Sequence, residues 1–259
     1  MSGQALIRRA DVDVAACVEQ IDAELRAAGS PERAGQERAY LKTVREHYGA
    51  PVPAVRAVAK VFRAGHPGLG RDELLRLAGA LWAPQVHERR LVTVELLVLY
   101  GDRLAACDLA MIEQLLREAG TWALLDPMAE TVAGRLVERH AELGAMLDRW
   151  AADDDFWIRR SALLALLKPL RRGEGDFGRF ARYADQMLEE KEFFIRKAIG
   201  WVLRETAKKR PGLVYGWLLP RAARASGVTL REAVKPLAPA QRAAILTAHT
   251  GRSPSHRAG

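Results

Sequence analysis

Apolar residues recur at intervals of three and four positions along most of the chain, a spacing typical of amphipathic helices. The clearest of these patterns cover residues 12–27, 39–47, 55–64, 73–82, 88–100, 109–117 and 128–139, and further stretches continue to the end. Glycine or proline interrupts the pattern at 49–51, 65–68, 83–84, 126–127, 173–175 and 210–212. No convincing alternation of apolar and polar residues appears, so the sequence predicts an all-α protein of about a dozen helices joined by short loops.

A repeat becomes visible when the basic helical segments are aligned. Residues 156–162 (FWIRRSA) match residues 193–199 (FFIRKAI) at an offset of 37, and the segment HERRLV at 87–92 lies close to two such periods earlier. A period in the high thirties with two helices per unit is typical of HEAT-like repeats. We therefore expect an α-solenoid of about six HEAT-like helix pairs with a concave basic cleft. The alternative is an irregular helical bundle.

The alignment places Arg90, Arg160 and Lys197 in one column, which a solenoid would turn into a row of positive charge on one side. Trp201 follows Lys197 by one helical turn, where the equivalent residue after Arg160 is the aliphatic Leu164. A tryptophan at this position is available to a ligand. The alternative is that Trp201 packs in the core, as most tryptophans largely do.

Charge is distributed unevenly over the 259 residues, whose net charge is +8. From Phe156 onward there are 21 basic and 8 acidic residues, whereas the preceding part has 19 and 24. Such a cationic region suits a polyanionic partner, because neutralising phosphates releases condensed counterions. A general solubility bias is the alternative explanation for the charge alone.

The rest of the composition indicates one globular domain, and its few scattered histidines and cysteines are consistent with the absence of a metal or organic cofactor. Cys17 and Cys107 are far apart and the six histidines are scattered, so neither a disulfide framework nor a zinc cluster is expected. No stretch reaches the about 18 apolar residues of a membrane span, and residues 1–9 lack the apolar run of a signal peptide. We expect a cytoplasmic protein with a single domain over residues 1–248 and a disordered basic tail at 249–259.

Trp122 and Asp126 are a candidate pair in the middle of the chain. They are four residues apart, so a helix would bring them to one side. A purely structural role is also open, because Asp126 followed by Pro127 is a common N-cap and first-turn pair.

The segment from Phe193 to Glu205 resembles the signature of the AlkD family of DNA glycosylases, HEAT-like-repeat enzymes that excise alkylated purines. Four further segments are similar to the family pattern in the same order, so the resemblance covers roughly residues 30 to 240. They are Ala39-Tyr40-Leu41-Lys42, Leu81-Trp82 with Glu88-Arg89, Trp122-x-x-x-Asp126 and Trp157-x-x-Arg160-x-Ala162.

The resemblance implies a role for each candidate residue. Asp126 corresponds to the catalytic carboxylate, and Trp122 and Trp201 correspond to paired indoles that flank the damaged nucleotide. Arg160 and Arg204 are expected to contact the DNA backbone, with Phe194 and Tyr40 near the lesion. The base would not swing into a deep pocket, in contrast to most glycosylases.

The predicted chemistry is monofunctional hydrolysis, without strand cleavage, of the N-glycosidic bond of a cationic N3- or N7-alkylated purine. Indole faces and an ionised carboxylate both stabilise positive charge, and a carboxylate can also orient water. The expected partner is double-stranded DNA carrying an alkylated purine, bound by a monomer. Two alternatives are a non-catalytic HEAT-repeat protein that binds bent or branched DNA, and a protein-interaction scaffold.

Substrate range stays open at the level of sequence. The same residues are compatible with simple methyl lesions and with a bulky purine adduct left by a DNA-alkylating antibiotic, which a self-resistance enzyme would remove. Pro127 adds a question about Asp126, because it fixes the start of a helix and could direct the carboxylate toward a backbone cap.

Overall fold

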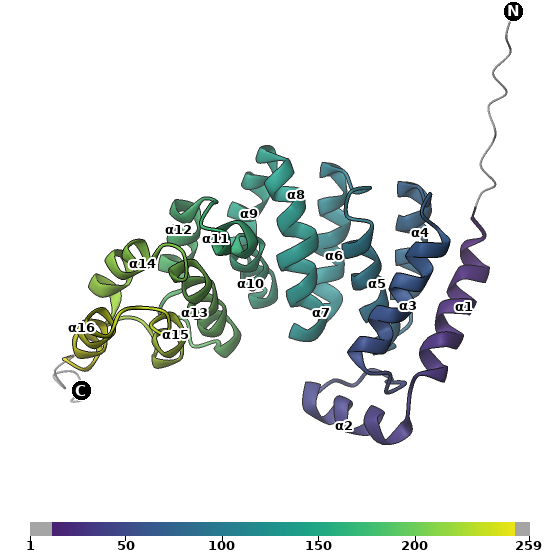
Figure 1. The fold of residues 1–259 in the computed structure, drawn as a ribbon, viewed down its shortest axis with the longest axis horizontal. Helices are drawn as coiled ribbons and strands as arrows, with labels where there is room; N and C mark the ends of the chain where they lie inside the picture. Colours follow the sequence, from purple (N-terminus) through teal and green to yellow (C-terminus); the bar gives the residue numbers. More distant parts are fainter. Residues whose placement is uncertain (1–11, 252–259) are drawn as a thin grey trace, which may run out of the picture. The chain divides into compact units, whose positions relative to one another are not determined.

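The computed structural model describes residues 12–251, and the regular elements in this range are helices, as the sequence predicts (Figure 1). The one pairing of extended backbone among these residues is an isolated bridge between Glu46 and Val86. None of the helices in this range is long and apolar enough to cross a membrane. The described helices form two compact units that are divided between Leu104 and Ala105. The single domain expected over residues 1–248 stays a prediction. Apart from the last turn of α16, the predicted tail lies outside the described residues.

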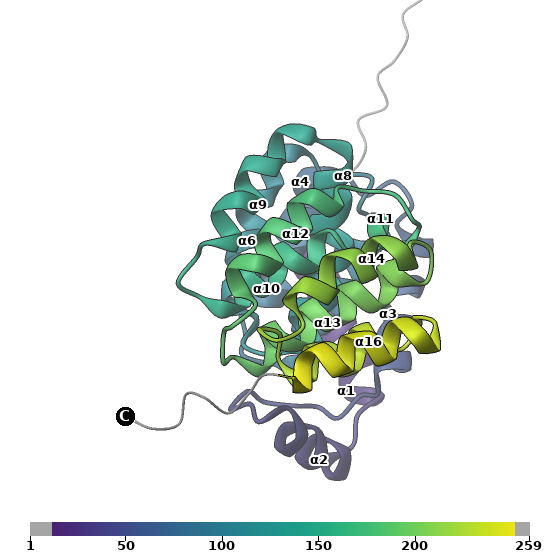
Figure 2. The ribbon, with the colours of Figure 1, turned by 90° about the vertical axis from the view of Figure 1, so that its left-hand side faces the viewer.

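Unit 1 contains five α-helices within the described residues. They are α1 (Val14–Ala27), α2 (Pro31–Leu41), α3 (Val52–Gly65), α4 (Arg71–Trp82) and α5 (His87–Leu99). Helices α1, α3, α4 and α5 pack on one another through buried apolar faces, whereas α2 has no buried residue. Both views show α2 beyond the ends of the other helices of this unit (Figures 1 and 2).

Unit 2 begins with a short turn of 3-10 helix and continues with a series of mostly short helices. They are α6 (Leu109–Ala119), α7 (Trp122–Pro127), a π-helical segment (Met128–Ala133), α8 (Gly134–Arg139), α9 (Gly144–Ala151), α10 (Phe156–Ala165), α11 (Leu167–Arg171), α12 (Phe177–Met187), α13 (Phe193–Ala207), α14 (Pro211–Leu218), α15 (Gly227–Ala233) and α16 (Pro239–Thr250). Helix α10 packs on α9, and α13 packs on α12 and α14, so successive helices form antiparallel pairs (Figures 1 and 2).

The predicted repeat is visible in the hydrogen bonds of unit 2. Many side chains bond to a residue 33 to 37 positions away, which is one repeat. Examples are Arg117 to Asp153, Trp150 to Glu113, Tyr183 to Asp148 and Arg221 to Asp185. The helices α10 and α13, which carry the two matching sequence segments, lie side by side. Each repeat therefore contacts its neighbours, as a helical-repeat protein requires.

Two sequence predictions about helix ends are wrong. The helix expected at 39–47 does not form, because α2 ends at Leu41 and Lys42 adopts a left-handed conformation with φ 51°. The break expected at 126–127 is absent, since Pro127 lies inside a helix that continues through the π-helical segment into α8. Proline removes one backbone donor, and a π-helical turn is a recognised accommodation of such a defect in a helix.

Candidate functional site

An ion pair between Asp126 of α7 and Arg160 of α10 is the most strongly anchored polar contact among the candidate residues. Arg160 Nε donates to Asp126 Oδ1 at 2.8 Å, and Nη2 donates to Oδ2 at 2.7 Å. The Arg160 side chain is 3% exposed and the Asp126 side chain 14% exposed. A bidentate pair of this kind fixes the plane as well as the position of the carboxylate.

The same guanidinium also reaches the start of α13. Arg160 Nη1 donates to the backbone carbonyl of Phe194, and its charged carbon lies 5.7 Å from the centre of the Phe194 ring. Arg160 therefore ties together three helices, α7, α10 and α13. Its burial differs from the sequence expectation, because a guanidinium that donates to two protein groups and is 3% exposed presents no charge to a phosphate in this structure.

Helix α7 exposes an indole one turn before the carboxylate. Thr121 caps the helix, with its hydroxyl accepting from the backbone N–H of Ala123 at 3.3 Å. Trp122 is the first helical residue and is 37% exposed. Asp126 lies four residues later on the same helix, and its carboxylate is held by Arg160 instead of capping the backbone.

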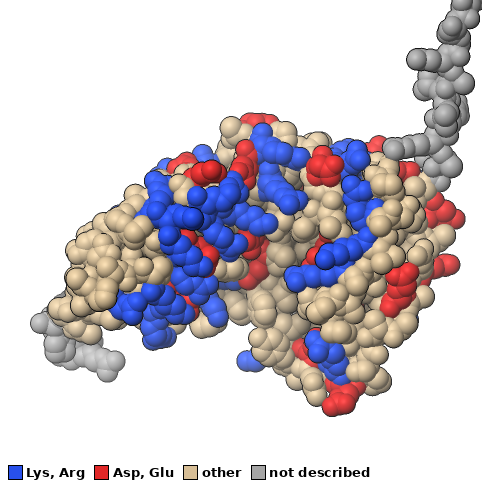
Figure 3. Space-filling model, in the orientation of Figure 1, with Lys and Arg blue, Asp and Glu red and all other residues tan. Residues whose placement is uncertain are grey.

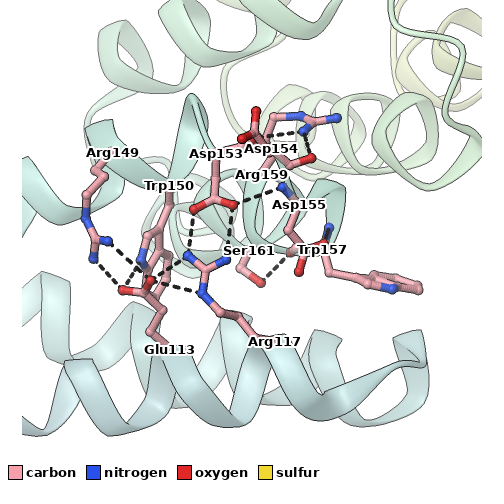
Figure 4. Close-up of polar contacts among 10 residues, drawn as sticks. All are labelled: Glu113, Arg117, Arg149, Trp150, Asp153, Asp154, Asp155, Trp157, Arg159 and Ser161. Carbon is pink, nitrogen blue, oxygen red and sulfur yellow. Dashed lines mark hydrogen bonds and ion pairs between the residues drawn. The ribbon is translucent and has the colours of Figure 1, made fainter.

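A buried polar network fixes the start of α10, the helix that carries Arg160 (Figure 4). Glu113 of α6 accepts from Trp150 Nε1 at 2.8 Å and from Arg117 at 2.7 Å. Arg117 also donates to Asp153 at 2.6 Å. Asp155 then caps α10 by accepting from the backbone N–H of Trp157 at 2.8 Å. The chain entering α10 is therefore held to α6 and α9, which limits how far Arg160 can move.

Aromatic rings cluster around the side chain of Phe194, the residue whose carbonyl accepts from Arg160. Trp157 lies 4.8 Å from Phe194, and Phe156 stacks on Phe194 at 6.4 Å between ring centres. Phe193 meets the edge of Phe194 at 5.5 Å and is 50% exposed. The beginnings of α10 and α13 thus form an aromatic cluster of Phe156, Trp157, Phe193 and Phe194.

One face of α13 carries aromatic and basic residues that are not buried. Phe193, Lys197, Trp201, Arg204 and Lys208 follow one another at intervals of three and four, and each is at least partly exposed. The Lys197 ammonium lies 5.7 Å from the centre of the Phe193 ring. Arg204 donates to Glu205 at 3.1 Å and also pairs with Glu232. Trp201 is half-buried, so its availability to a ligand stays a prediction.

Comparisons with known proteins identify the family of the chain. A family model described as DNA alkylation repair enzyme matches residues 21–237. The chain belongs to the family of DNA alkylation repair enzymes. This agrees with the AlkD-like resemblance found in the sequence.

Solved structures of two other proteins have a similar fold. A predicted DNA alkylation repair enzyme from Enterococcus faecalis is 24% identical, with a TM-score of 0.73, and the match covers 82% of this chain and 97% of that one. AlkD2 from Streptococcus mutans is 14% identical, with a TM-score of 0.56, and the match covers 80% and 98%. No curated protein matches the chain. At these identities the likeness concerns the fold, which is helical and repetitive.

In this member of the family, the two site residues predicted in unit 1 have different surroundings. Arg90 is 2% exposed, donates to the carbonyl of Trp82 at 3.1 Å, and has its guanidinium 4.7 Å from the centre of the Trp82 ring. It adds no exposed charge to the expected row. Tyr40 lies on α2 and is 72% exposed, so its ring is accessible to a partner.

Further cations gather where α8, α11 and α13 approach one another. Lys168 donates to Thr131 at 2.8 Å. Burial lowers the pKa of Lys168, and the positive charges of the neighbouring Arg135, Arg171 and Arg172 lower it further. The negative charge of Glu130 acts in the opposite direction. Lys and Arg side chains are concentrated over this part of unit 2 in the space-filling view (Figure 3). The cationic surface of the C-terminal half therefore includes side chains that the repeat alignment did not identify.

The structure joins Asp126, Arg160 and Phe194 by direct contacts, and it places Trp122 beside Asp126 and Trp201 beside Lys197 along their helices. The pairing of Trp122 with Trp201 across a nucleotide stays a prediction. The ion pair itself was missed in the sequence, although a signal existed. Asp126 precedes Arg160 by 34 residues, close to one repeat, which is the separation at which neighbouring repeats touch.

Proposed function

We propose that this member of the DNA alkylation repair family is a monofunctional DNA glycosylase. Its reaction would be hydrolysis of the N-glycosidic bond of a purine alkylated at N3 or N7 in duplex DNA. The observation that carries the proposal is the Asp126 carboxylate, fixed by Arg160 one helical turn from the exposed indole of Trp122.

The charge of the substrate explains why these groups suit the reaction. Alkylation at N3 or N7 makes the purine cationic and weakens its bond to the sugar. As the neutral base departs, positive charge moves to an oxocarbenium-like sugar. An indole face attracts such a cation by about 0.5–2 kcal/mol, and a carboxylate with fixed geometry does so more strongly where water is scarce.

Asp126 would have two tasks in this reaction. Its negative charge would stabilise the developing cation, and a lone pair left free by Arg160 would orient the attacking water. Arg160 would act as a positioning residue, because it fixes the carboxylate without facing the solvent. A carboxylate that needs no reorganisation during the reaction is more effective than a mobile one.

The remaining predicted residues would bind the duplex. We assign Trp201 to the side of the nucleotide opposite Trp122, and Lys197 and Arg204 to the phosphate backbone. Phe194 would lie near the lesion through its place in the aromatic cluster. Tyr40, which the resemblance also assigns to the lesion, is part of the same proposal. A monomer would suffice for this binding, and the chemistry invokes neither a metal ion nor an organic cofactor.

Substrate size is part of the proposal and follows from the exposure of Trp122. An indole that is 37% exposed, next to a carboxylate 14% exposed, can be reached without enclosing the base. Small methyl lesions and bulky adducts are therefore both admissible, and the second would make the protein a self-resistance enzyme.

The reaction is tested by identifying its products. Duplex DNA containing 7-methylguanine, 3-methyladenine or a bulky minor-groove purine adduct is incubated with the full chain, and released bases are measured by mass spectrometry. We expect the free alkylated base and an intact abasic strand that breaks only on later treatment with alkali. Strand scission without alkali, or the absence of any released base from all three substrates, would contradict the proposal.

A non-catalytic role in binding bent or branched DNA is the second candidate. It is favoured by one observation, namely that both oxygens of Asp126 already accept from Arg160, which is also what a purely structural aspartate would do. Under this alternative, the chain would bind DNA junctions tightly and release no base. The product assay therefore separates the two functions.

A further inference from the structure

A buried histidine of unit 1 has no hydrogen-bond partner for either ring nitrogen. The His47 side chain is 1% exposed, and both its Nδ1 and its Nε2 are buried and unsatisfied. Because one nitrogen of a neutral imidazole is a donor and the other an acceptor, a change of tautomer satisfies neither. Buried polar groups in native proteins nearly always have a partner, so this ring calls for one that is not a protein atom.

Two carboxylates face this histidine. Oxygen atoms of Glu37 and Glu88 and a nitrogen of His47 lie within 4.8 Å of one another. Glu37 Oε2 is 3.9 Å from His47 Nδ1, too long for a hydrogen bond. Ligand atoms that share a first-row metal ion at 2.0–2.2 Å are separated by about 3–4 Å. The three groups therefore enclose a space that a small cation fits after slight side-chain rotation.

Each carboxylate keeps bonding capacity for such an ion. Glu88 is fully buried, and its Oε1 accepts from the backbone N–H groups of Gly49 at 2.7 Å and Ala50 at 3.2 Å. Its Oε2 accepts from the backbone N–H of Tyr48, at 3.0 Å. Glu37 accepts from Arg33 through Oε1, at 2.5 Å, so Oε2 is the atom turned toward His47. These bonds fix both carboxylates and leave one oxygen of each able to coordinate.

The surrounding packing holds the imidazole in place. The His47 ring stacks on His87, with 4.5 Å between ring centres and 10° between planes. A stacked ring cannot swing out to meet water without losing this contact. The site is thus preorganised on the nitrogen side by His87 and on the oxygen side by the loop at Tyr48, Gly49 and Ala50.

The position of the cluster suggests what an ion would do. Glu37 belongs to α2, which has no buried residue, whereas Glu88 belongs to the buried helix α5. His47 lies in the loop that joins α2 to α3. A helix of 11 residues without an apolar anchor is marginal in water. An ion shared by these residues would attach α2 to the core of unit 1. It would also position Tyr40, one turn after Glu37.

We propose that Glu37, His47 and Glu88 form a structural site for a first-row divalent cation, with Zn²⁺ as the ion that this set of one imidazole and two carboxylates suits. The ion clamps α2 to α5. This site is distinct from the proposed reaction, and it was missed in the sequence because its three ligands have no local metal-binding spacing.

The test uses the full-length chain without an affinity tag, stripped of metal with EDTA. Zn²⁺ alone is titrated by calorimetry, and hydrogen exchange of the α2 amides is followed with and without the ion. We expect one Zn²⁺ per chain, slower exchange in α2, and no comparable effect of Mg²⁺, which an imidazole ligand disfavours.

Matched variants decide whether these residues are the ligands. Glu37→Gln removes an accessible ligand and is expected to weaken Zn²⁺ binding at least tenfold, the lower limit seen even for residues that only support a ligand. Glu32→Gln, on the exposed part of the same helix, should leave binding unchanged. His47→Phe keeps the stack on His87 and should abolish binding in a folded protein. The proposal would be overturned if Glu37→Gln and the wild type bound Zn²⁺ with equal affinity. It would also be overturned if Zn²⁺ left the hydrogen-exchange rates of the α2 amides unchanged.

Discussion

The single buried guanidinium of Arg160 holds both the carboxylate of Asp126 and the start of α13. The arginine is buried, its two carboxylate bonds are 2.8 and 2.7 Å long, and its third contact reaches the backbone of α13. A lysine has the same charge but only a point-like ammonium, which cannot hold a carboxylate in one plane. The geometry of the guanidinium, more than its charge, is therefore what the proposed chemistry requires.

Replacing Arg160 by lysine tests this role. The variant keeps a cation beside Asp126 but frees the carboxylate to rotate, and we expect kcat for base release to fall by about 100-fold. KM for DNA should change little, because Arg160 is not exposed. Arg182→Lys is the matched control, since Arg182 is 59% exposed. A large rise in KM with kcat unchanged would indicate instead that Arg160 contacts DNA.

At the scale of the elements, α13 is held in place by very close packing against α15. A Cβ added at Gly200 would lie 2.8 Å from the carbonyl oxygen of Thr229 and 2.9 Å from Glu232 Cβ. The Thr229 hydroxyl also donates to the carbonyl of Arg196 at 3.0 Å. Only glycine permits this approach, which sets the position of the helix that carries Lys197 and Trp201.

Gly200→Ala should therefore destabilise the protein by about 1–3 kcal/mol, because neither backbone can move away freely. Gly216→Ala in α14 is the control, as an added Cβ there meets nothing within 4 Å. That second change should stabilise the helix by about 0.5–1 kcal/mol. Chemical denaturation of the two variants measures both effects, and equal stability would refute the packing argument.

The network around Glu113 makes a pH-dependent contribution to stability. Burial on its own would raise the pKa of Glu113, but hydrogen bonds from Trp150, Arg117 and Arg149 outweigh it and lower that pKa below 4.5. The unfolded chain then binds the proton first as the pH falls. The stabilisation is therefore complete above about pH 4.5 and is lost as the pH decreases through the lowered value.

Glu113→Gln should lower the free energy of unfolding by about 1–3 kcal/mol at pH 7, since it removes the charge that pairs with Arg117 and Arg149 and weakens the acceptor of the buried Trp150 N–H. The difference from the wild type should shrink as the pH falls below about 4.5. Glu118→Gln, exposed on the same helix, should show neither effect. Urea unfolding at pH 7 and pH 4 measures this, and a difference that widens toward acid would contradict the assigned direction.

The helices were predictable from the sequence where their periodicity reflects burial, as in α3, with buried Val55, Val58 and Phe62. The prediction failed at 39–47, because α2 has no buried face and ends through the backbone conformation of Lys42. The prediction of a helix break at Asp126 and Pro127 was wrong, because packing against α6 and α10 keeps the helix continuous. Local patterns do not report such tertiary effects.

The site was predictable only in part, for a related reason. Arg160 and Lys197 occupy equivalent places in the repeat, yet Arg160 is buried and Lys197 is exposed. The difference depends on Asp126, which lies one repeat earlier and accepts from Arg160. Whether an arginine is buried thus depends on its neighbour in space. The alignment of equivalent repeat positions does not show which residue that neighbour is.

At the scale of the whole molecule, the uneven charge is the feature most relevant to DNA. The sequence from Phe156 onward has 21 basic and 8 acidic residues, although several of the cations are paired with carboxylates, as Arg159 is with Glu190. The affinity for a duplex should therefore fall as the salt concentration rises. Binding should release fewer counterions than the total number of cations suggests.

A salt titration of duplex binding measures this contribution. The logarithm of the association constant should fall linearly with the logarithm of salt concentration, and Lys197→Ala should make the slope shallower by about 1. Arg90→Lys should leave the slope unchanged, because Arg90 is buried. Binding that is insensitive to salt would argue against a phosphate-binding surface.

The central claim is that Asp126 performs the chemistry of base release. It is tested most directly by the single-turnover rate of base release from duplex DNA containing 7-methylguanine, for the wild type and Asp126→Asn. The asparagine keeps the shape of the side chain and one acceptor for Arg160 but loses the charge. We expect release to be abolished, while duplex affinity and the circular dichroism spectrum stay close to those of the wild type. Full activity of Asp126→Asn would contradict the claim.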